Sequence, residues 1–282
     1  MQRTIILNTP PVVPASGVAV FDLNNLLGTC LETLNIDLGG GSFTKSMITG
    51  MVLKGNNKII WETDGTKHNL AELFKGYLSA DDTARICLNF MEQKARTPMA
   101  FQAGAIDLSP SSGITNLKLE ITIAGATTPT LAGVAEVSAI NTDPAEANIR
   151  YLFKRRHRAP QSIGAAGKFA VIVPHMDPAG GGSLFQRIGI VTSNYTAVQL
   201  MWNGSVQLDL TKAQLEYMQK KAGRMPQAGY MCLDFLLDNI QTNRLFDTTP
   251  GGGCQSAQLY LTLSASETIT VETEELLPLN AY

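Results

Sequence analysis

The residues whose types and spacing could do chemistry are few in this chain of 282 residues. The densest group is the basic run Lys154-Arg155-Arg156-His157-Arg158. Such a run can attract anionic lipid headgroups or the phosphates of a genome, each basic residue contributing on the order of 1 kcal/mol near a charged membrane. A solvated linker is an equally good interpretation. We therefore treat Lys154, Arg155, Arg156 and Arg158 as a possible membrane- or genome-facing patch.

Histidine, the usual metal ligand, occurs only as His68, His157 and His175. Enzymes built from two fused jelly rolls hold their metal with a His-x-His pair, a following Glu and a later His. The chain has no His-x-His, and we expect no histidine partner near His175, so metal-dependent dioxygenase or isomerase chemistry lacks its ligands. A serine hydrolase is also disfavoured, because no Gly-x-Ser-x-Gly is present. We predict no enzyme activity, no catalytic metal and no organic cofactor.

Carboxylates and glycines offer two further kinds of site. Asp81-Asp82 and Asp177 could bind a hard cation. A structural calcium is possible there, although lone acidic groups more often cap helices or strands and calcium needs six or more oxygens. Glycine triplets at 39–41, 180–182 and 251–253 lack the Lys-Ser/Thr partner of a nucleotide loop, so we interpret them as surface loops.

Composition excludes other classes. The net charge of −2 provides no excess of base to hold phosphates, so we expect no sequence-specific binding of nucleic acid. No apolar stretch reaches the 18 or more residues that read as a membrane span, and Ile5-Ile6-Leu7 is too short for a signal core. Cys30, Cys87, Cys232 and Cys254 show no Cys-x-x-Cys pair. This is typical of reduced thiols and of assembly in a reducing cytoplasm.

The elements that must position these residues occur twice. Ile86-Cys87-Leu88-Asn89-Phe90 returns as Met231-Cys232-Leu233-Asp234-Phe235. A strand, a tight turn and a second strand precede each copy, with Gly55-Asn56-Asn57 and Asn203-Gly204 as the turns. A repeat of about half the chain length predicts two copies of one domain, each of about 140 residues.

A short helix follows the hairpin in each half. Apolar residues at helical spacing include Leu70, Leu73 and Phe74 in the first copy, and Leu215 and Met218 in the second. The predicted caps are Asn69 with Glu72, and Thr211 with Gln214, and the predicted left-handed stops are Gly76 and Gly223.

The repeated strands after the helices have a predicted core face. Ile86, Leu88 and Phe90 point to one side, and so do their counterparts in the second copy, because successive strand residues face opposite ways. Cys87 and Cys232 therefore lie on the opposite face. A cysteine there suggests that this face is also covered, by the sister domain or by a neighbouring subunit.

Turn signals recur at short intervals and strands outnumber helices, which favours an all-β fold. We predict two tandem eight-stranded jelly-roll sandwiches, each with one short helix. The predicted organisation is an extended arm over 1–16, a first jelly roll over 17–140, a basic connector over 141–166 and a second jelly roll over 167–282. Strands are expected at 18–23, 31–38, 47–54, 57–63, 84–92, 99–107, 117–124 and 133–140, then at 168–174, 186–193, 197–202, 205–210, 229–237, 243–248, 257–264 and 267–274.

This order of elements, made twice with a basic connector between, resembles the double jelly-roll major capsid proteins of icosahedral bacteriophages with an internal membrane. Three segments look similar to that family: Leu7-Asn8-Thr9-Pro10 in the arm, Leu152-Phe153-Lys154-Arg155-Arg156 in the connector, and Val198-Gln199-Leu200-Met201-Trp202-Asn203-Gly204 before the helix near Leu215. The short length is closest to the corticovirus type.

The resemblance implies a major capsid protein. Its homotrimers would form pseudo-hexagonal tiles of an icosahedral shell over an internal lipid membrane, a virion capsid assembled in the host cytoplasm. The implied partners are further copies of the chain, vertex or penton proteins, membrane-associated virion proteins and the lipids of the internal membrane. A tandem jelly-roll carbohydrate-binding or adhesin protein is the alternative, and a bicupin-type enzyme is the third and weakest. Trp61 and Trp202 lie in the repeated hairpin, where we expect a structural role rather than a sugar site.

Overall fold

A computed structural model of the chain describes residues 2–77, 83–95, 103–139, 152–239 and 245–278. The chain divides into two compact units. The first comprises Met1–Asn69, Ser79–Arg156 and Leu277–Tyr282, and the second comprises Leu70–Leu78 and His157–Leu276. The main boundary, between Arg156 and His157, falls within the segment 141–166 that the sequence suggests as a connector.

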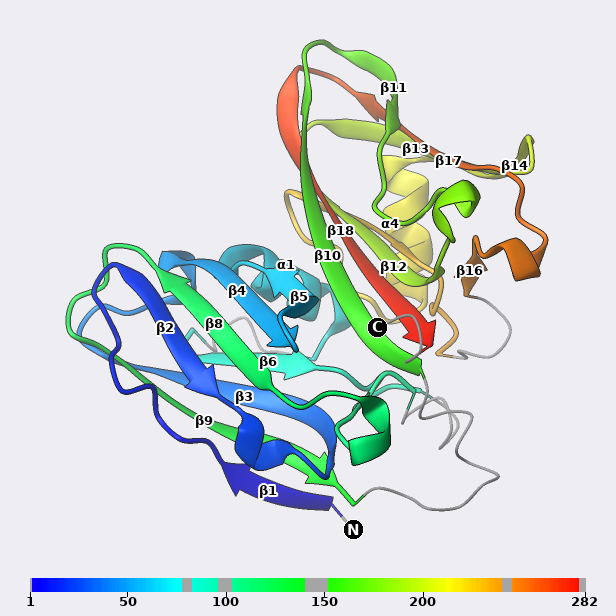
Figure 1. Ribbon diagram of the computed structural model, residues 1–282. Helices are drawn as coiled ribbons and strands as arrows, with labels where there is room; N and C mark the ends of the chain where they lie inside the picture. Colours follow the sequence, from blue (N-terminus) through cyan, green and yellow to red (C-terminus); the bar gives the residue numbers. More distant parts are fainter. Residues whose placement is uncertain (1, 78–82, 96–102, 140–151, 240–244, 279–282) are drawn as a thin grey trace. The chain divides into compact units, whose positions relative to one another are not determined.

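The first unit is a sandwich of two sheets (Figure 1). Its strands are β1 (Gln2–Ile6), β2 (Gly17–Asp22), β3 (Cys30–Gly40), β4 (Ile48–Gly55), β5 (Lys58–Thr63), β6 (Arg85–Asn89), β7 (Ile106–Asp107), β8 (Leu117–Ile123) and β9 (Pro129–Ser138). One sheet has the order β1-β9-β3-β6, with β7 beside β3, and the other contains β5-β4-β8-β2. Ile36, Leu88, Leu53 and Leu119 belong to one buried cluster, so both sheets contribute to a common core.

The second unit repeats this topology. Its strands are β10 (Leu152–Ile163, of which the part from His157 belongs to this unit), β11 (Gly167–Val171), β12 (Leu184–Val191), β13 (Tyr195–Trp202), β14 (Ser205–Thr211), β15 (Tyr230–Asp234), β16 (Phe246–Asp247), β17 (Ala257–Leu263) and β18 (Glu267–Pro278). The order β10-β18-β12-β15, with β16 beside β12, matches β1-β9-β3-β6 with β7. The order β11-β17-β13-β14 likewise matches β2-β8-β4-β5. The repeat predicted from two similar strands therefore extends to every described strand of each half.

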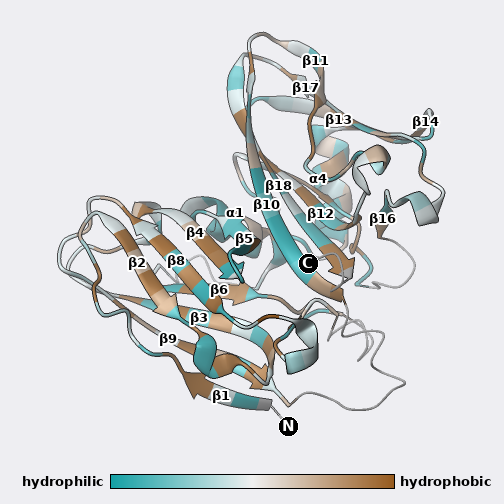
Figure 2. Cartoon of the chain, in the orientation of Figure 1, coloured by the Kyte–Doolittle hydropathy of each residue, from teal (hydrophilic) through white to brown (hydrophobic). Residues whose placement is uncertain are grey.

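Among the described residues, each repeat has one strand more than the eight predicted. The additional strands are β1, which pairs antiparallel with β9, and β10. Figure 2 shows hydrophilic residues along much of β10, so this strand lacks the apolar alternation that reveals the others. The strand predicted at 99–107 is shorter in the described residues, where β7 covers only Ile106–Asp107.

The two hairpin turns are fastened by equivalent asparagines. Asn56 and Asn203 have left-handed φ values of 46° and 49°, as tight turns between strands require. The Asn203 Nδ2 donates to the carbonyl of Gly253 at 2.9 Å, and its Oδ1 accepts from two backbone N–H groups. The Asn56 Nδ2 donates to the carbonyl of Gly113 at 2.6 Å, and its Oδ1 also accepts from two backbone N–H groups. In the first repeat the turn asparagine thus holds the loop before β8, and in the second it holds the loop before β17. We call each of these sets of hydrogen bonds a hairpin clamp.

Helix α4 (Lys212–Lys221) is capped as predicted. Thr211 and Gln214 form a reciprocal capping box, in which each side chain accepts from the backbone N–H of the other residue. Gly223 follows the helix with φ of 75°, and Gly76 follows the first helix with φ of 71°. Both predicted left-handed stops are confirmed.

Helix α1 (Gly65–Lys75) begins earlier than predicted. The Asp64 Oδ1 accepts from the backbone N–H of Lys67 at 2.9 Å, which is the contact of an N-cap. The predicted cap of Asn69 with Glu72 is wrong, because both residues lie inside the helix. The error has a physical reason: Asp64 directly follows β5, where its carboxylate could equally have belonged to a turn. Among the described residues, no helix is long and apolar enough to cross a membrane.

Candidate functional site: the basic strand and a buried ion-pair network

The predicted basic patch lies on strand β10, and half of it is buried. Lys154 is fully buried, with its Nζ 3.5 Å from the Glu92 Oε2, whose side chain is also inaccessible to solvent. Arg156 is 1% exposed. Arg155 and Arg158 are partly exposed. Of the four predicted residues, these last two are therefore the ones that a charged surface outside the chain can reach.

Arg156 contacts an aromatic and imidazole cluster of the first unit. Its guanidinium lies 5.5 Å from the centroid of the buried Trp61 ring, a cation–π distance. The Arg156 Nη1 lies 3.4 Å from the His68 Nδ1, and the His68 Nε2 lies 2.9 Å from the carbonyl oxygen of Cys87. Because a guanidinium can only donate and a carbonyl can only accept, we assign His68 as the neutral tautomer that carries its proton on Nε2. Helix α1 thus contacts the backbone of β6 at Cys87.

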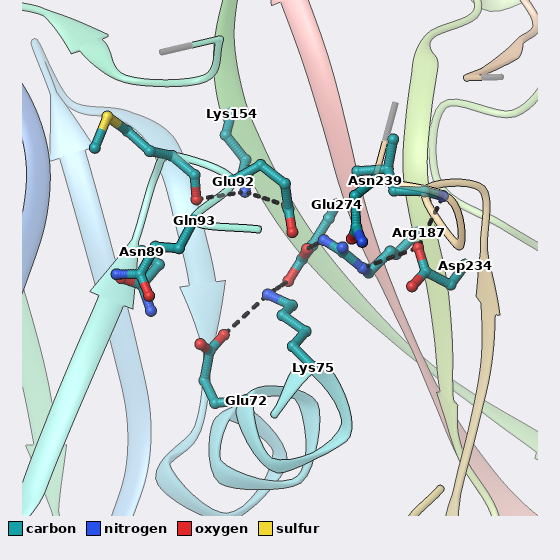
Figure 3. A network of polar contacts seen from close by, with 12 residues as sticks. Glu72, Lys75, Asn89, Glu92, Gln93, Lys154, Arg187, Asp234, Asn239 and Glu274 are labelled. Carbon is teal, nitrogen blue, oxygen red and sulfur yellow. Dashed lines mark hydrogen bonds and ion pairs between the residues drawn. The ribbon is translucent and has the colours of Figure 1, made fainter. Parts of the chain in front are cut away.

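The second unit contains a chain of buried ion pairs (Figure 3). Lys75, at the end of helix α1, lies 2.9 Å from the Glu72 Oε1 and 2.6 Å from the Glu274 Oε1 on β18. The Arg187 Nη1 on β12 lies 3.1 Å from the Glu274 Oε2, and its Nε lies 3.2 Å from the Asp234 Oδ1 on β15. These five side chains are at most 5% exposed.

Arg224 extends this chain of ion pairs beyond Asp234. Its Nε lies 2.6 Å from the Asp234 Oδ2, and its Nη2 donates to the carbonyl of Leu236 at 2.7 Å. The Arg224 Nη2 also donates to the Asn239 Oδ1 at 3.1 Å. We call Glu72, Lys75, Glu274, Arg187, Asp234 and Arg224 the buried ion-pair network.

The network contains as many acids as bases, so its formal charges cancel. Burial of a single charge would cost several kcal/mol, and each of these charges has at least one opposite charge within 3.2 Å. Such an arrangement does no chemistry on a substrate but joins helix α1, β12, β15 and β18. Sequence reasoning missed it, because a charged residue in a strand reads as solvent-facing unless its partner is known.

Cys232, on the face of β15 opposite the core, is covered as predicted. It belongs to a small buried cluster with Ala71, Phe74 and Tyr230, of which the first two come from helix α1. The Gln219 Nε2 of helix α4 donates to the Cys232 carbonyl at 2.6 Å. Burial, together with the negative charge of Asp234, raises the pKa of the Cys232 thiol well above its usual range. The thiol therefore stays protonated at neutral pH, and it forms no disulfide.

Two further predicted positions can be placed. The Asp177 Oδ1 accepts from the backbone N–H of Ala179 at 2.9 Å, so this carboxylate caps a short 3-10 helix, η4 (Pro178–Gly180). Asp81-Asp82 lies outside the described residues. The expectation that His175 has no histidine partner is wrong, because its ring centroid lies 4.7 Å from that of His157. The two residues are 18 positions apart, and the course of the chain between β10 and β11 that joins them was not visible in the sequence.

Two family models account for most of the chain. The viral coat protein P2 N-terminal domain matches residues 4–138, and the viral coat protein P2 C-terminal domain matches residues 153–279. The chain belongs to the viral coat protein P2 family. Members of this family are structural proteins rather than enzymes, which agrees with the prediction of no enzyme activity.

Solved structures show the fold of this P2-family chain. The major capsid protein P2 from bacteriophage PM2 superposes with a TM-score of 0.83 at 16% identity, over 98% of this chain and 97% of that one. The STIV MCP matches with a TM-score of 0.74 at 12% identity, over 99% and 97% of the two chains. PBCV-1 VP54 matches with a TM-score of 0.63 at 10% identity, over 98% and 93%. No curated protein matches the chain in sequence.

These likenesses confirm the predicted double jelly roll and the resemblance to the corticovirus type. The P2-family chain is thus a viral coat protein and a component of the virion. The buried ion-pair network and the hydrogen bonds of Asn56 and Asn203 each join several elements of this fold.

Proposed function

We propose that the chain is a major capsid protein whose homotrimers form pseudo-hexagonal tiles of an icosahedral shell over an internal lipid membrane. The observation that carries this proposal is the repetition of one strand topology within each chain. Three chains with two similar sandwiches each present six similar sides, so that neighbouring tiles can pack laterally with few distinct contacts. The PM2 protein that shares this fold is itself a major capsid protein.

The partners follow from this arrangement. The chain would contact itself within the trimer and between trimers, vertex or penton proteins where the shell closes, and membrane-associated virion proteins beneath it. Assembly in the host cytoplasm is supported by the four cysteines, which form no disulfide. Arg155 and Arg158 would contribute the contact with anionic headgroups, because Lys154 and Arg156 are buried.

The test is the oligomeric state and shape of the purified protein. We expect light scattering to give a mass of three 30.3-kDa chains and electron microscopy to show hexagon-shaped particles. Trimers mixed with anionic vesicles should co-sediment, and the double variant Arg155→Gln/Arg158→Gln should weaken this binding while leaving the trimer intact. Arg85→Gln is the matched control, because its side chain is 58% exposed and lies outside the patch. A protein that stays monomeric at high concentration would contradict the proposal.

The rival function, a tandem jelly-roll carbohydrate-binding protein, disagrees with the match to the viral coat protein P2 family. Sugar sites of this kind present exposed aromatic faces. Trp61 is fully buried and Trp202 is partly buried, as predicted for structural tryptophans. Retention of a monomer on a sugar column would favour the rival.

A further inference from the structure

Three potential metal ligands from distant parts of the sequence meet in the second unit. His157 lies on β10, His175 follows β11, and Glu275 lies on β18, which neighbours β10. One ligand atom of each lies within 4.8 Å of those of the other two. The His175 Nδ1 is 3.0 Å from the Glu275 Oε1, and the two imidazole rings have centroids 4.7 Å apart. No other such group of three occurs among the described residues.

The group has a buried end and an open end. The Glu275 side chain is fully buried, and a buried carboxylate needs a cation or hydrogen-bond donors to balance its loss of water. The His175 side chain is 38% exposed, so that an ion can reach it from solvent. His175 has a left-handed φ of 57°, a conformation that few residues other than glycine adopt and that the surrounding structure must hold in place.

We propose that His157, His175 and Glu275 bind one divalent transition-metal ion, with Zn²⁺ as the best fit. Two imidazole nitrogens and one carboxylate oxygen are ligands that zinc accepts, and water can complete a tetrahedron. Calcium and magnesium prefer sets made of oxygen alone, so this donor set selects against them. The three ligands all belong to the second unit, and the inference does not depend on the proposed trimer.

To bind one zinc ion, the three ligand atoms must move slightly closer together than the 4.8 Å within which they lie. Around a tetrahedral zinc with bonds of about 2.0–2.1 Å, ligand atoms lie about 3.3 Å apart. The His175–Glu275 pair already lies near this separation, and rotation of the imidazole rings brings the third ligand closer. The bound ion would link β10, β18 and the segment after β11, and would therefore stabilise the second unit rather than catalyse a reaction.

The test is titration of the full chain, first stripped with EDTA, with ZnCl₂. We expect calorimetry to give one site per chain, and the melting temperature to rise by several degrees in excess Zn²⁺. Co²⁺ should bind in place of Zn²⁺ and give the visible absorption of a tetrahedral site. CaCl₂ at the same concentration should leave the melting temperature unchanged.

The variants separate the site from general folding. His175→Asn removes the imidazole but suits the left-handed backbone, and Glu275→Gln removes the carboxylate charge at nearly constant volume. Each should weaken Zn²⁺ binding about 100-fold or more and abolish the Co²⁺ absorption. Asp177→Asn is the matched control from the same segment, because it retains the oxygen that caps η4 and should bind Zn²⁺ normally. Failure of the unaltered chain to bind Zn²⁺ would overturn the proposal, and so would binding that both ligand variants leave unchanged.

Discussion

At the scale of single residues, charges buried inside the second unit should contribute strongly to stability. Lys75 lies between two buried carboxylates, those of Glu72 and Glu274. In Lys75→Met, both carboxylates lose this cation while remaining buried. We expect the free energy of unfolding in urea to fall by about 3–5 kcal/mol, the usual cost of removing one partner from a buried pair.

Lys54→Met is the control for the same chemical change at the surface. Lys54 pairs with Glu120 at 2.6 Å, but their side chains are 29% and 31% exposed, so its loss should cost at most about 1 kcal/mol. Adding Glu72→Gln to Lys75→Met should recover part of the lost stability, because one unbalanced charge is then removed. Equal costs for the two methionine variants would show that the network adds no stability.

At the scale of elements, the asparagine at each hairpin turn combines a left-handed backbone with three hydrogen bonds from its side chain to the backbone of a distant loop. Asn203→Ala removes the bonds to Gly253, Gln255 and Ser256. It also leaves alanine, which has no side-chain hydrogen bonds to offset the strain, at the left-handed φ of 49°. We expect a loss of about 2–3 kcal/mol in the free energy of unfolding. Asn56→Ala should cost a similar amount, because the first repeat makes the equivalent bonds.

Asn203→Gly distinguishes strain from lost bonding. Glycine adopts the left-handed conformation freely, so this variant loses the same side-chain bonds and should be about 1 kcal/mol more stable than Asn203→Ala. Denaturant unfolding of the three variants measures both differences. An alanine variant as stable as the natural chain would show that the clamp is dispensable.

At the scale of the whole molecule, the two sequence repeats do not coincide with the two compact units. Leu70–Leu78, a segment that begins inside the helix of the first repeat, belongs to the second unit. Phe74 packs there with Tyr230 and Cys232, and Lys75 joins the buried ion-pair network. A fragment of residues 157–278 therefore lacks a buried aromatic side chain and a buried cation. We expect this fragment to bind a hydrophobic dye and to lack the sharp near-ultraviolet dichroism of a packed core.

One result of the fragment experiment would contradict this prediction. Cooperative unfolding of residues 157–278 alone, with native near-ultraviolet dichroism, would show that helix α1 is not needed for the second unit. The matched comparison is Phe74→Ala in the full chain, which should cost about 3–5 kcal/mol while keeping Lys75 in place.

Local patterns in the sequence determined much of the fold. The two-residue alternation assigned the core faces of β6 and β15, and turn chemistry located the hairpin turns at Asn56 and Asn203, although not the hydrogen bonds that these asparagines make to distant loops. The cap of helix α4 was also predictable, because Thr211 and Gln214 are only three positions apart. Each of these signals acts between residues close in sequence, where periodicity and propensity hold the information.

Only the tertiary structure decided where the charged and ligating side chains lie. Lys75 and Glu274 are 199 positions apart, and His175 and Glu275 are 100 positions apart. Lys75 also pairs with Glu72, three residues away, but burial of a charge needs every partner in place, and the sequence near Lys75 or His175 carries no record of the distant ones. For this reason the basic run appeared to be a surface patch, whereas Lys154 and Arg156 are buried in the first unit.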